Sequence, residues 1–157
     1  MGAVIVRAPV AADRAALLEA LERCGAFSAL EVEIAIGMID EALAGDYSVV
    51  GVEVDGVLRG YTLLGRATLT ERSWYLYWIC VHPAYERRGL AQALQRAADD
   101  LVQAAGGDKI VLETSGRSGY ARSRAFYERA GFAETGRIRD FYAAGDDCII
   151  YCKTLPT

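Results

Sequence analysis

Two arginines and a glycine stand where an apolar segment gives way to a helical one. The segment Leu76–Val81 is followed by Pro83 and then by Arg87, Arg88 and Gly89. The first turn of a helix has backbone N–H groups without internal partners, and the helix dipole adds partial positive charge there. Glycine permits close approach of an anion, and arginine supplies charge for phosphate. The local pattern fits a phosphate-binding turn and a solvated turn equally well. A Walker loop and a dinucleotide-binding loop are excluded, because no Gly-Lys-Ser/Thr follows and only one glycine is present.

Residues 74–81, which lead into this turn, carry four aromatic side chains and are followed by the one histidine of the chain. His82 invites a role as a general base, but its place between Val81 and Pro83 favours a turn residue. Aromatic rings can stack a ring-shaped ligand or enclose an ammonium group. Because side chains alternate between the two faces of a strand, we expect most of these rings in the core, with Tyr77 the exception of interest. The four residues are Trp74, Tyr75, Tyr77 and Trp78.

Composition and charge narrow the class of protein. The 157 residues are 53% hydrophobic and 24% charged, which suits a single domain over residues 1–157 with a substantial core. A net charge of -4 disfavours non-specific nucleic-acid binding. No apolar run reaches the roughly 20 residues that span a membrane, and no basic segment marks a signal peptide. We therefore expect a cytoplasmic protein that binds neither nucleic acid nor membrane.

The four cysteines predict free thiols. Cys24 and Cys80 stand apart in the sequence, and Cys148 and Cys152 are too widely spaced for a zinc knuckle. One histidine leaves little to complete a metal site, so we expect no metal. Cysteines of this kind stay reduced in the cytosol.

Periodicity and turn residues predict alternating strands and helices. Strands are expected at 3–7, 47–54, 57–68, 74–81, 109–114, 132–140 and 147–154. Helices are expected from Pro9 to Cys24, with Asp13 as the cap, and at 29–44, 89–105 and 120–130. Asp55-Gly56 predicts a two-residue hairpin turn, and the strand–helix–strand segment 74–114 predicts a parallel crossover.

The same patterns predict the buried sides of these elements. The nearly continuous apolar run at 74–81 predicts a strand covered on both faces. The fold class is therefore α/β, with a mixed, mostly antiparallel sheet and helices on both faces. The expected helical stripes are Leu17, Leu18 and Leu21; then Leu30, Ile34, Met38 or Ile39, and Ala42; then Leu90, Leu94, Ala97 and Leu101.

Two segments resemble the signatures of a known family. Ile79–Gln95 (ICVHPAYERRGLAQALQ) is similar to a motif of the GNAT family of N-acetyltransferases, in which V-x-P at a strand end precedes [QR]-x-x-G-x-[GA] and a helix. Ser123–Phe132 (SRAFYERAGF) resembles the second motif of that family. The expected element order is similar to the family fold, so the resemblance covers nearly the whole chain. Glu86 departs from the Gln or Arg that the family prefers.

The resemblance implies acetyl-CoA as the co-substrate. In the family the loop amides bind its pyrophosphate, a role that falls on Arg87, Arg88, Gly89, Leu90, Ala91 and Gln92. The backbone of the preceding strand pairs with the pantetheine arm, and one N–H there stabilises the thioester oxyanion. This role falls on Ile79, Cys80 and Val81. Tyr120 stands where many relatives have an Asn that contacts pantetheine, and Ser123 stands where Ala is commoner. We expect both residues at the cofactor.

Acetyl transfer to an amine requires one proton to leave and another to arrive. An alkylamine with an ordinary pKa of about 10.4 must be deprotonated before it attacks. Glu113 matches a glutamate that a subset of the family uses as the base; a salt bridge to an arginine of 117–124 is the alternative. Tyr127 matches the tyrosine that protonates the leaving thiolate; a core aromatic is the alternative. Direct attack is the family expectation, so Cys80 is not expected to carry the acetyl group.

The resemblance therefore implies an acetyl-CoA-dependent N-acetyltransferase that acts on a primary amine by direct attack. A small-molecule amine or amino acid is the expected acceptor, with a protein or peptide N-terminus or lysine as the alternative. Asp140, Asp146 and Asp147 either draw in a cationic acceptor or form a solvated turn. A CoA-binding module without turnover is the alternative from another class. Many relatives dimerise, so a homodimer stays open.

Overall fold

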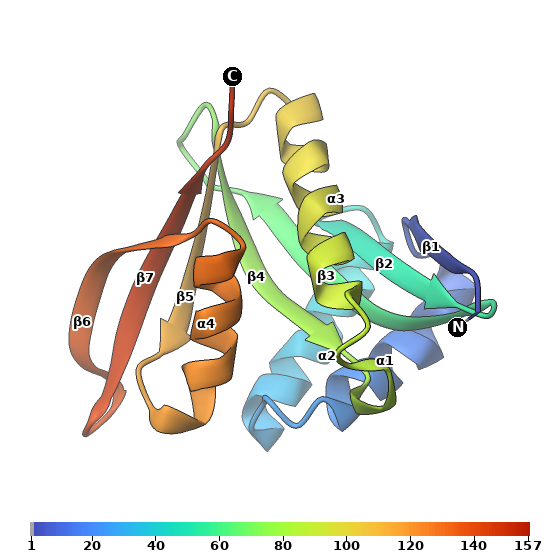
Figure 1. The fold of residues 1–157 in the computed structure, drawn as a ribbon, viewed down its shortest axis with the longest axis horizontal. Coiled ribbons are helices and arrows are strands. Elements are labelled where there is room, and N and C mark those ends of the chain that lie inside the picture. The colour runs from blue at the N-terminus through green and yellow to red at the C-terminus, as the bar shows by residue number, and fades with distance from the viewer. Residues whose placement is uncertain (1) are drawn as a thin grey trace. The chain divides into compact units, whose positions relative to one another are not determined.

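The computed structural model describes residues 2–157, and within them seven strands form a mostly antiparallel sheet with four α-helices (Figure 1). Two compact units can be distinguished. The first contains the described chain up to Gly65 together with Trp78–Asp100, and the second contains Arg66–Tyr77 together with Leu101–Thr157. Strand β4 (Ser73–Val81) and helix α3 (Leu90–Ala104) contribute residues to both units. The predicted mixed α/β fold class is confirmed.

The first unit is built on antiparallel strands. Strand β1 pairs with β2, β2 pairs with β3, and β3 lies next to β4. Asp55 and Gly56 join β2 to β3 with φ angles of 52° and 81°, the two positive angles that a tight hairpin turn requires. The predicted hairpin is therefore confirmed. The remaining elements of this unit are β1 (Val4–Arg7), α1 (Arg14–Arg23), α2 (Ala29–Leu43), β2 (Ser48–Val54) and β3 (Val57–Arg66).

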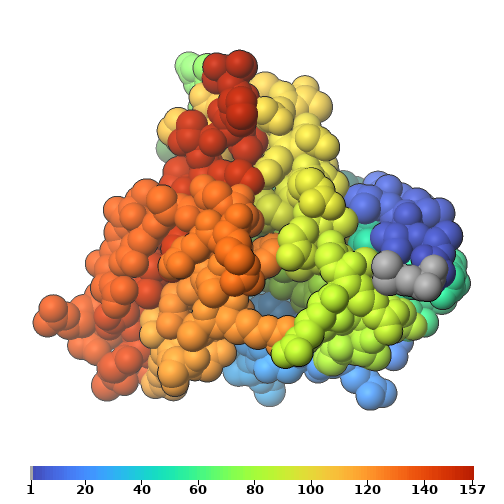
Figure 2. Space-filling model, in the orientation of Figure 1, coloured from blue at the N-terminus to red at the C-terminus, as the bar shows by residue number. Residues whose placement is uncertain are grey.

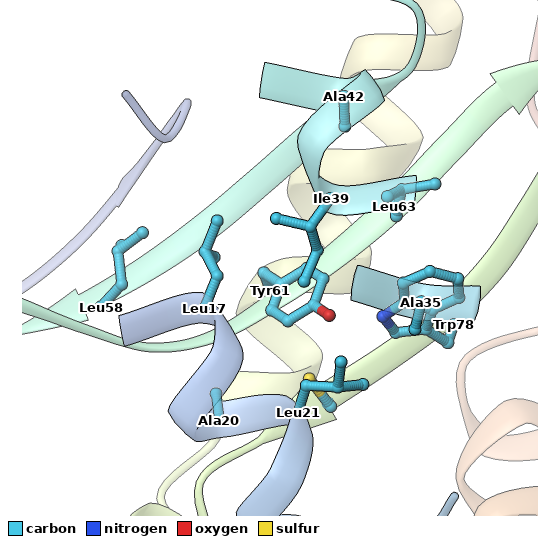
Figure 3. Close-up of a cluster of buried hydrophobic side chains, with 11 residues drawn as sticks. Leu17, Ala20, Leu21, Ala35, Ile39, Ala42, Leu58, Tyr61, Leu63 and Trp78 are labelled. Carbon is cyan, nitrogen blue, oxygen red and sulfur yellow. The ribbon is translucent and has the colours of Figure 1, made fainter. Parts of the chain in front are cut away.

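Helices α1 and α2 bury their apolar sides against β3 and β4 (Figure 3). Leu17 of α1 and Ile39 of α2 are fully buried with Tyr61 of β3. Burying a large apolar side chain contributes about 1.5–3 kcal/mol each. Thr62 and Leu64, which point to the other face of β3, are also fully buried, and α3 crosses the side of the strands opposite α1 and α2 (Figure 1). Helices on both faces, as predicted, therefore enclose the strands of this unit.

The buried side of α2 differs from the predicted stripe. Ala35, Ile39 and Ala42 are buried, whereas Leu30 and Ile34 are 66% and 56% exposed. Apolar residues surround most of this helix, so two stripes at helical spacing fit its sequence equally well. Packing against β3 selects the stripe that contains Ile39.

The buried side of α3 also departs from prediction in its second half. Leu90 and Leu94 are buried as expected. After Leu94 the buried stripe continues through Ala98 and Val102 in place of the predicted Ala97 and Leu101, which are only half-buried. Steps of three and four residues both follow a helix face, so the sequence leaves this choice to tertiary packing. None of the helices within residues 2–157 is long and apolar enough to cross a membrane.

The first helical segment begins differently from prediction. A short 3-10 helix, Ala11–Asp13, precedes α1. The Asp13 carboxylate accepts a hydrogen bond from Val10 N at 2.8 Å and pairs with Arg7 at 2.7 Å. The hydrogen bond from Arg7 lowers the pKa of Asp13. Asp13 therefore ties β1 to the turn before α1 and makes no side-chain cap on α1 itself.

The second unit joins the start of β4 to three later strands. Strand β5 runs parallel to β4, with Ser73–Tyr75 in register with Lys109–Val111, so the predicted parallel crossover is confirmed. Strand β7 lies between β5 and β6 and is antiparallel to both. Strand β6 extends beyond its predicted end, which leaves Ala144 and Gly145 as the hairpin turn. The elements are β5 (Lys109–Ser115), α4 (Ala121–Arg129), β6 (Ala133–Ala143) and β7 (Asp146–Thr154).

Strand β4 has one covered face and one open face, which corrects the prediction that both faces are covered. Trp74 and Trp78 are buried, whereas Tyr75 and Tyr77 are each 40% exposed. The phenol groups tolerate water, so an apolar-looking run can still alternate between core and solvent. Alternation separates the four aromatic residues, but the expectation that most of them lie in the core is wrong, because only the two tryptophans are buried. Tyr75 joins Tyr77 on the open face, with ring centroids 6.2 Å apart.

Candidate cofactor loop and catalytic residues

The turn between β4 and α3 carries the residues predicted to bind a pyrophosphate. Pro83–Tyr85 form a short 3-10 helix, and His82 Nδ1 accepts a hydrogen bond from Ala84 N at 3.2 Å. His82 Nε2 lies 3.6 Å from the Glu19 carboxylate. His82 is therefore a turn residue, as predicted. This stretch, yellow-green in Figure 2, lies on the face of the molecule that is drawn.

Backbone N–H groups are available throughout the next six residues. From Arg87 to Gln92, no backbone N–H has a hydrogen-bond acceptor within residues 2–157. The first amide to donate is that of Ala93, which bonds the Gly89 carbonyl at 3.0 Å. Helix α3 begins at Leu90, so the positive end of its dipole coincides with these groups. Such a run of free N–H groups at a helix N-terminus suits phosphate.

The loop also has an unusual backbone and unpaired charge. Arg87 and Gly89 have φ angles of 59° and 77°. A left-handed conformation costs a non-glycine residue about 1–2 kcal/mol, and such strain concentrates at functional sites. A Cβ on Gly89 would meet no heavy atom within 4 Å, so the space over the loop is open. No carboxylate in the described part of the chain pairs with Arg87 or Arg88. Both guanidinium groups are therefore available to an anion.

Ile79, Cys80 and Val81 form the end of β4 that leads into this loop. Strand β3 approaches them closely at Gly60, where a Cβ would lie 2.7 Å from the Cys80 carbonyl oxygen. The Cys80 side chain is buried, and those of Ile79 and Val81 are half-buried. The structure thus holds this backbone firmly on its β3 side. Its pairing with pantetheine stays a prediction.

Two thiols meet in the core of the first unit. Cys80 belongs to the buried cluster, and Cys24 packs against it at the end of α1. The hydrogen bond from Cys80 lowers the pKa of Cys24 to about 7. Burial raises the pKa of Cys80. All four cysteines of the chain, which lie within the described residues, are free, as predicted.

Glu113, the predicted base, lies within β5. The strand continues to Ser115, one residue beyond its predicted end, so Glu113 lies inside it. Its side chain is exposed on the face opposite Leu112, and its register partner is Ile150 of β7. No arginine pairs with Glu113 within residues 2–157, so the alternative of a salt bridge to 117–124 is not seen. The carboxylate stands free on the open face of the second unit.

Tyr142 of β6 brings a hydroxyl into the electrostatic field of Glu113, a feature that sequence reasoning missed. Its Oη lies 3.8 Å from Cys148 Sγ. The pKa of the Tyr142 hydroxyl is raised by partial burial, by its hydrogen bond to Cys148 and by the negative charge of Glu113. The hydroxyl therefore stays protonated at neutral pH. The sequence alone does not indicate this contact, because only the pairing of β6 with β7 places Tyr142 beside Cys148.

Three α4 positions to which the resemblance assigned roles lie on one side of that helix. Tyr120 is its N-cap, and Ser123 and Tyr127 follow at positions three and seven residues later. Tyr127 is half-buried, and its ring centroid lies 5.8 Å from that of Phe132 and 6.3 Å from that of Tyr151. The ring of Tyr127 therefore packs near other aromatic rings without being part of the buried core. The catalytic role of its hydroxyl stays a prediction.

A polar network fixes the loop between β5 and α4. Ser115 Oγ donates a hydrogen bond to the buried Asp146 carboxylate, which also lies 3.4 Å from Arg117 Nε. Arg124 of α4 donates to the carbonyl oxygens of Ser115 and Arg117 at 2.7 and 2.8 Å. The sequence showed these side chains only as a polar loop, because their pairing depends on β7. The network holds the segment between Glu113 and Tyr120 in a defined shape.

The three aspartates near the last hairpin have internal partners. Besides Asp146, Asp140 accepts a hydrogen bond from Gly145 N at 2.7 Å. Asp147 accepts one from Asp140 N at 3.0 Å and lies 3.5 Å from Arg137. The structure therefore favours the turn-forming alternative over recruitment of a cationic acceptor.

Comparisons with known proteins agree with this fold and these motifs. Residues 14–132 match the model of the acetyltransferase (GNAT) family. A Desulfovibrio desulfuricans protein assigned to the GNAT family is 36% identical, with a TM-score of 0.93 over 98% of this chain and 100% of that one. N-alpha-acetyltransferase 30 of Schizosaccharomyces pombe is 34% identical over 95 residues, which are 60% of this chain and 56% of that protein. An N-acetyltransferase of Thermoplasma acidophilum, in complex with coenzyme A, shares the fold with a TM-score of 0.75 at 18% identity, over 97% of this chain and 99% of that one.

The chain belongs to the acetyltransferase (GNAT) family. The predicted family and the predicted class of enzyme, acetyltransferase, are therefore confirmed. The match with the curated Schizosaccharomyces pombe relative spans only a little over half of that protein.

Proposed function

We propose that this chain is an acetyl-CoA-dependent N-acetyltransferase that acetylates a primary amine by direct attack. The observation that carries the proposal is the run of unpartnered N–H groups from Arg87 to Gln92 at the start of α3. In a chain of this family, such a loop is suited to the pyrophosphate of CoA. Unpaired guanidinium groups at Arg87 and Arg88 add charge-assisted hydrogen bonds.

The strand before the loop supports the rest of the co-substrate. When bound, acetyl-CoA supplies an acetyl thioester. Ile79, Cys80 and Val81 offer backbone groups to its pantetheine arm, and one of their N–H groups stabilises negative charge on the thioester oxygen. Tyr120 and Ser123 are proposed as further cofactor contacts, because they share a side of α4 with Tyr127.

Two side chains of the second unit are proposed to handle the protons. Glu113, whose carboxylate has no arginine partner in the described chain, accepts the proton of the ammonium group directly or through water. Tyr127 donates its hydroxyl proton to the leaving sulfur. General acid and general base catalysis each contribute about 10²–10⁴-fold.

We propose that the acceptor is a primary amine, and two classes of acceptor are candidates. The first is a small-molecule amine or amino acid, as the sequence led us to expect. The second is the N-terminus of a peptide. The relative from Schizosaccharomyces pombe, named an N-alpha-acetyltransferase, favours this second candidate.

Thiol release tests the proposal. The protein is incubated with acetyl-CoA and either a panel of small amines and amino acids or a set of short peptides with free N-termini. We expect amine-dependent release of CoA and an acetylated amine in the mass spectrum. The class that is acetylated decides between the two candidates. Binding of acetyl-CoA without transfer to any amine or peptide would favour a non-catalytic CoA-binding module and contradict the proposal.

A further inference from the structure

Arg59 reaches the cofactor loop from a distant part of the sequence. It lies on β3, and its carbonyl oxygen accepts a hydrogen bond from His82 N at 2.7 Å. Its guanidinium carbon lies 4.7 Å from the centroid of the Tyr85 ring. The guanidinium carbon of Arg88 lies 5.0 Å from the same centroid. Two guanidinium groups, that of Arg59 on β3 and that of Arg88 in the loop, therefore stack on the ring of Tyr85.

Neither of these two guanidinium groups forms an ion pair with a carboxylate within residues 2–157. Arg59 Nε is shielded from solvent and has no hydrogen-bond partner in the described chain. A shielded donor without a partner is costly, and two like charges on one ring repel each other. Stacking on Tyr85 offsets only part of this cost. A phosphate bound at the guanidinium groups would supply the missing negative charge.

We propose that Arg59 is a second phosphate-binding arm of the cofactor site, and that Tyr85 positions it. The inference rests on the proposed use of acetyl-CoA. The ligand group is a phosphate of CoA, either the pyrophosphate or the 3′-phosphate. Arg59 acts with Arg88 and with the free N–H groups that begin at Arg87. Arginine suits this role because its fork of donors can bind two phosphate oxygens at once.

Calorimetric titration of the whole protein with CoA and with dephospho-CoA tests this inference. In Arg59→Gln we expect CoA to bind about tenfold or more weakly, as for a lost hydrogen bond to a charged group. Arg66→Gln is the matched control, because Arg66 also lies on β3 and stacks on an aromatic ring, Trp74, at 5.8 Å. Loss for both ligands assigns Arg59 to the pyrophosphate, and loss for CoA alone assigns it to the 3′-phosphate. Equal CoA affinity in Arg59→Gln and the natural protein overturns the inference.

Salt dependence separates phosphate binding from a merely structural role. Ionic strength screens the contact between Arg59 and phosphate, so CoA affinity in Arg59→Gln should fall less steeply with salt than in the natural protein. Arg59→Lys should keep the steep dependence. An affinity loss in Arg59→Gln with an unchanged salt dependence assigns Arg59 to structure alone and overturns the inference. Failure of the natural protein to bind CoA contradicts the proposed function itself, which distinguishes the two failures.

Tyr85 is tested by a pair of variants. Tyr85→Phe keeps the ring under both guanidinium groups and should retain the CoA affinity of the natural protein. Tyr85→Leu removes the ring and should weaken CoA binding in the manner of Arg59→Gln, with the same shallow salt dependence. If Tyr85→Leu binds CoA as tightly as Tyr85→Phe, Tyr85 does not position Arg59.

Discussion

At the scale of single residues, Tyr127 carries the sharpest chemical expectation. Tyr127→Phe removes the hydroxyl but keeps the ring that packs near Phe132 and Tyr151. We expect turnover to fall about 10²-fold or more, because protonation of the leaving sulfur is lost, while the affinity for acetyl-CoA is kept. Steady-state thiol release and calorimetry measure the two quantities. Tyr151→Phe, in the same aromatic cluster, is the control. Unchanged turnover in Tyr127→Phe would remove the hydroxyl from the mechanism.

Glu113 is tested through its ability to take a proton. Glu113→Gln keeps the shape of the side chain but cannot act as a base. We expect kcat/KM to fall about 10²-fold or more at neutral pH and to recover as the pH approaches the pKa of the amine, where the acceptor loses its proton unaided. Glu134→Gln on β6, where Glu134 pairs with Arg137 at 3.2 Å, is the control. A pH profile of Glu113→Gln that overlays that of the natural protein would exclude Glu113 as the base.

Cys24 is expected to be the most reactive thiol at neutral pH. The hydrogen bond from Cys80 lowers the pKa of Cys24 to about 7, so the nucleophilic thiolate forms as the pH rises through that value. An unperturbed thiol would ionise near pH 8.5. Iodoacetamide should therefore label Cys24 with a half-maximal rate near pH 7, as read by peptide mass spectrometry. Cys24→Ser supplies the baseline, and preferential labelling of Cys80 would contradict this assignment.

At the scale of elements, Gly60 decides how closely β3 can approach β4. A Cβ at position 60 would lie 2.7 Å from the Cys80 carbonyl oxygen, and a backbone atom cannot move aside easily. We expect Gly60→Ala to lower the free energy of unfolding by about 1–3 kcal/mol. Chemical denaturation measures it. Gly37→Ala on α2 is the matched control, because position 37 is exposed and a Cβ there meets nothing within 4 Å. It should stabilise the protein by up to about 1 kcal/mol. Equal stability of the two variants would contradict the close approach.

The elements also show which features sequence patterns can predict. The turn Asp55-Gly56 was predictable, because its positive φ angles depend on two adjacent residues. The position of the loop Arg87–Gln92 at the start of α3 was predictable, because its motif is contiguous, whereas its role stays a prediction. The buried stripe of α2 was not, because its sequence is apolar on several sides and only contact with β3 selects Ile39. The contact between Arg59 and Tyr85 was also not predictable, because no residue near position 59 in the sequence indicates it.

At the scale of the whole molecule, two independent kinds of observation support the proposed acetyl transfer from acetyl-CoA. The chain belongs to the acetyltransferase (GNAT) family, and the Desulfovibrio desulfuricans relative matches it along its full length. The loop before α3 has free N–H groups and unpaired arginines of the kind that a phosphate requires. That residues 1–157 form a single domain stays a prediction, and a homodimer stays open.

Thermal unfolding with acetyl-CoA tests the central claim most directly. A ligand that binds only the folded protein, at about 100 times its Kd, adds about 2.7 kcal/mol of stability. We expect acetyl-CoA to raise the Tm clearly and ATP, the control for phosphate groups alone, to leave it nearly unchanged. A clear rise with acetyl-CoA alone would support a CoA site at Arg87–Gln92. No rise with either ligand, or equal rises with both, would contradict that site and with it the proposed acetyl transfer.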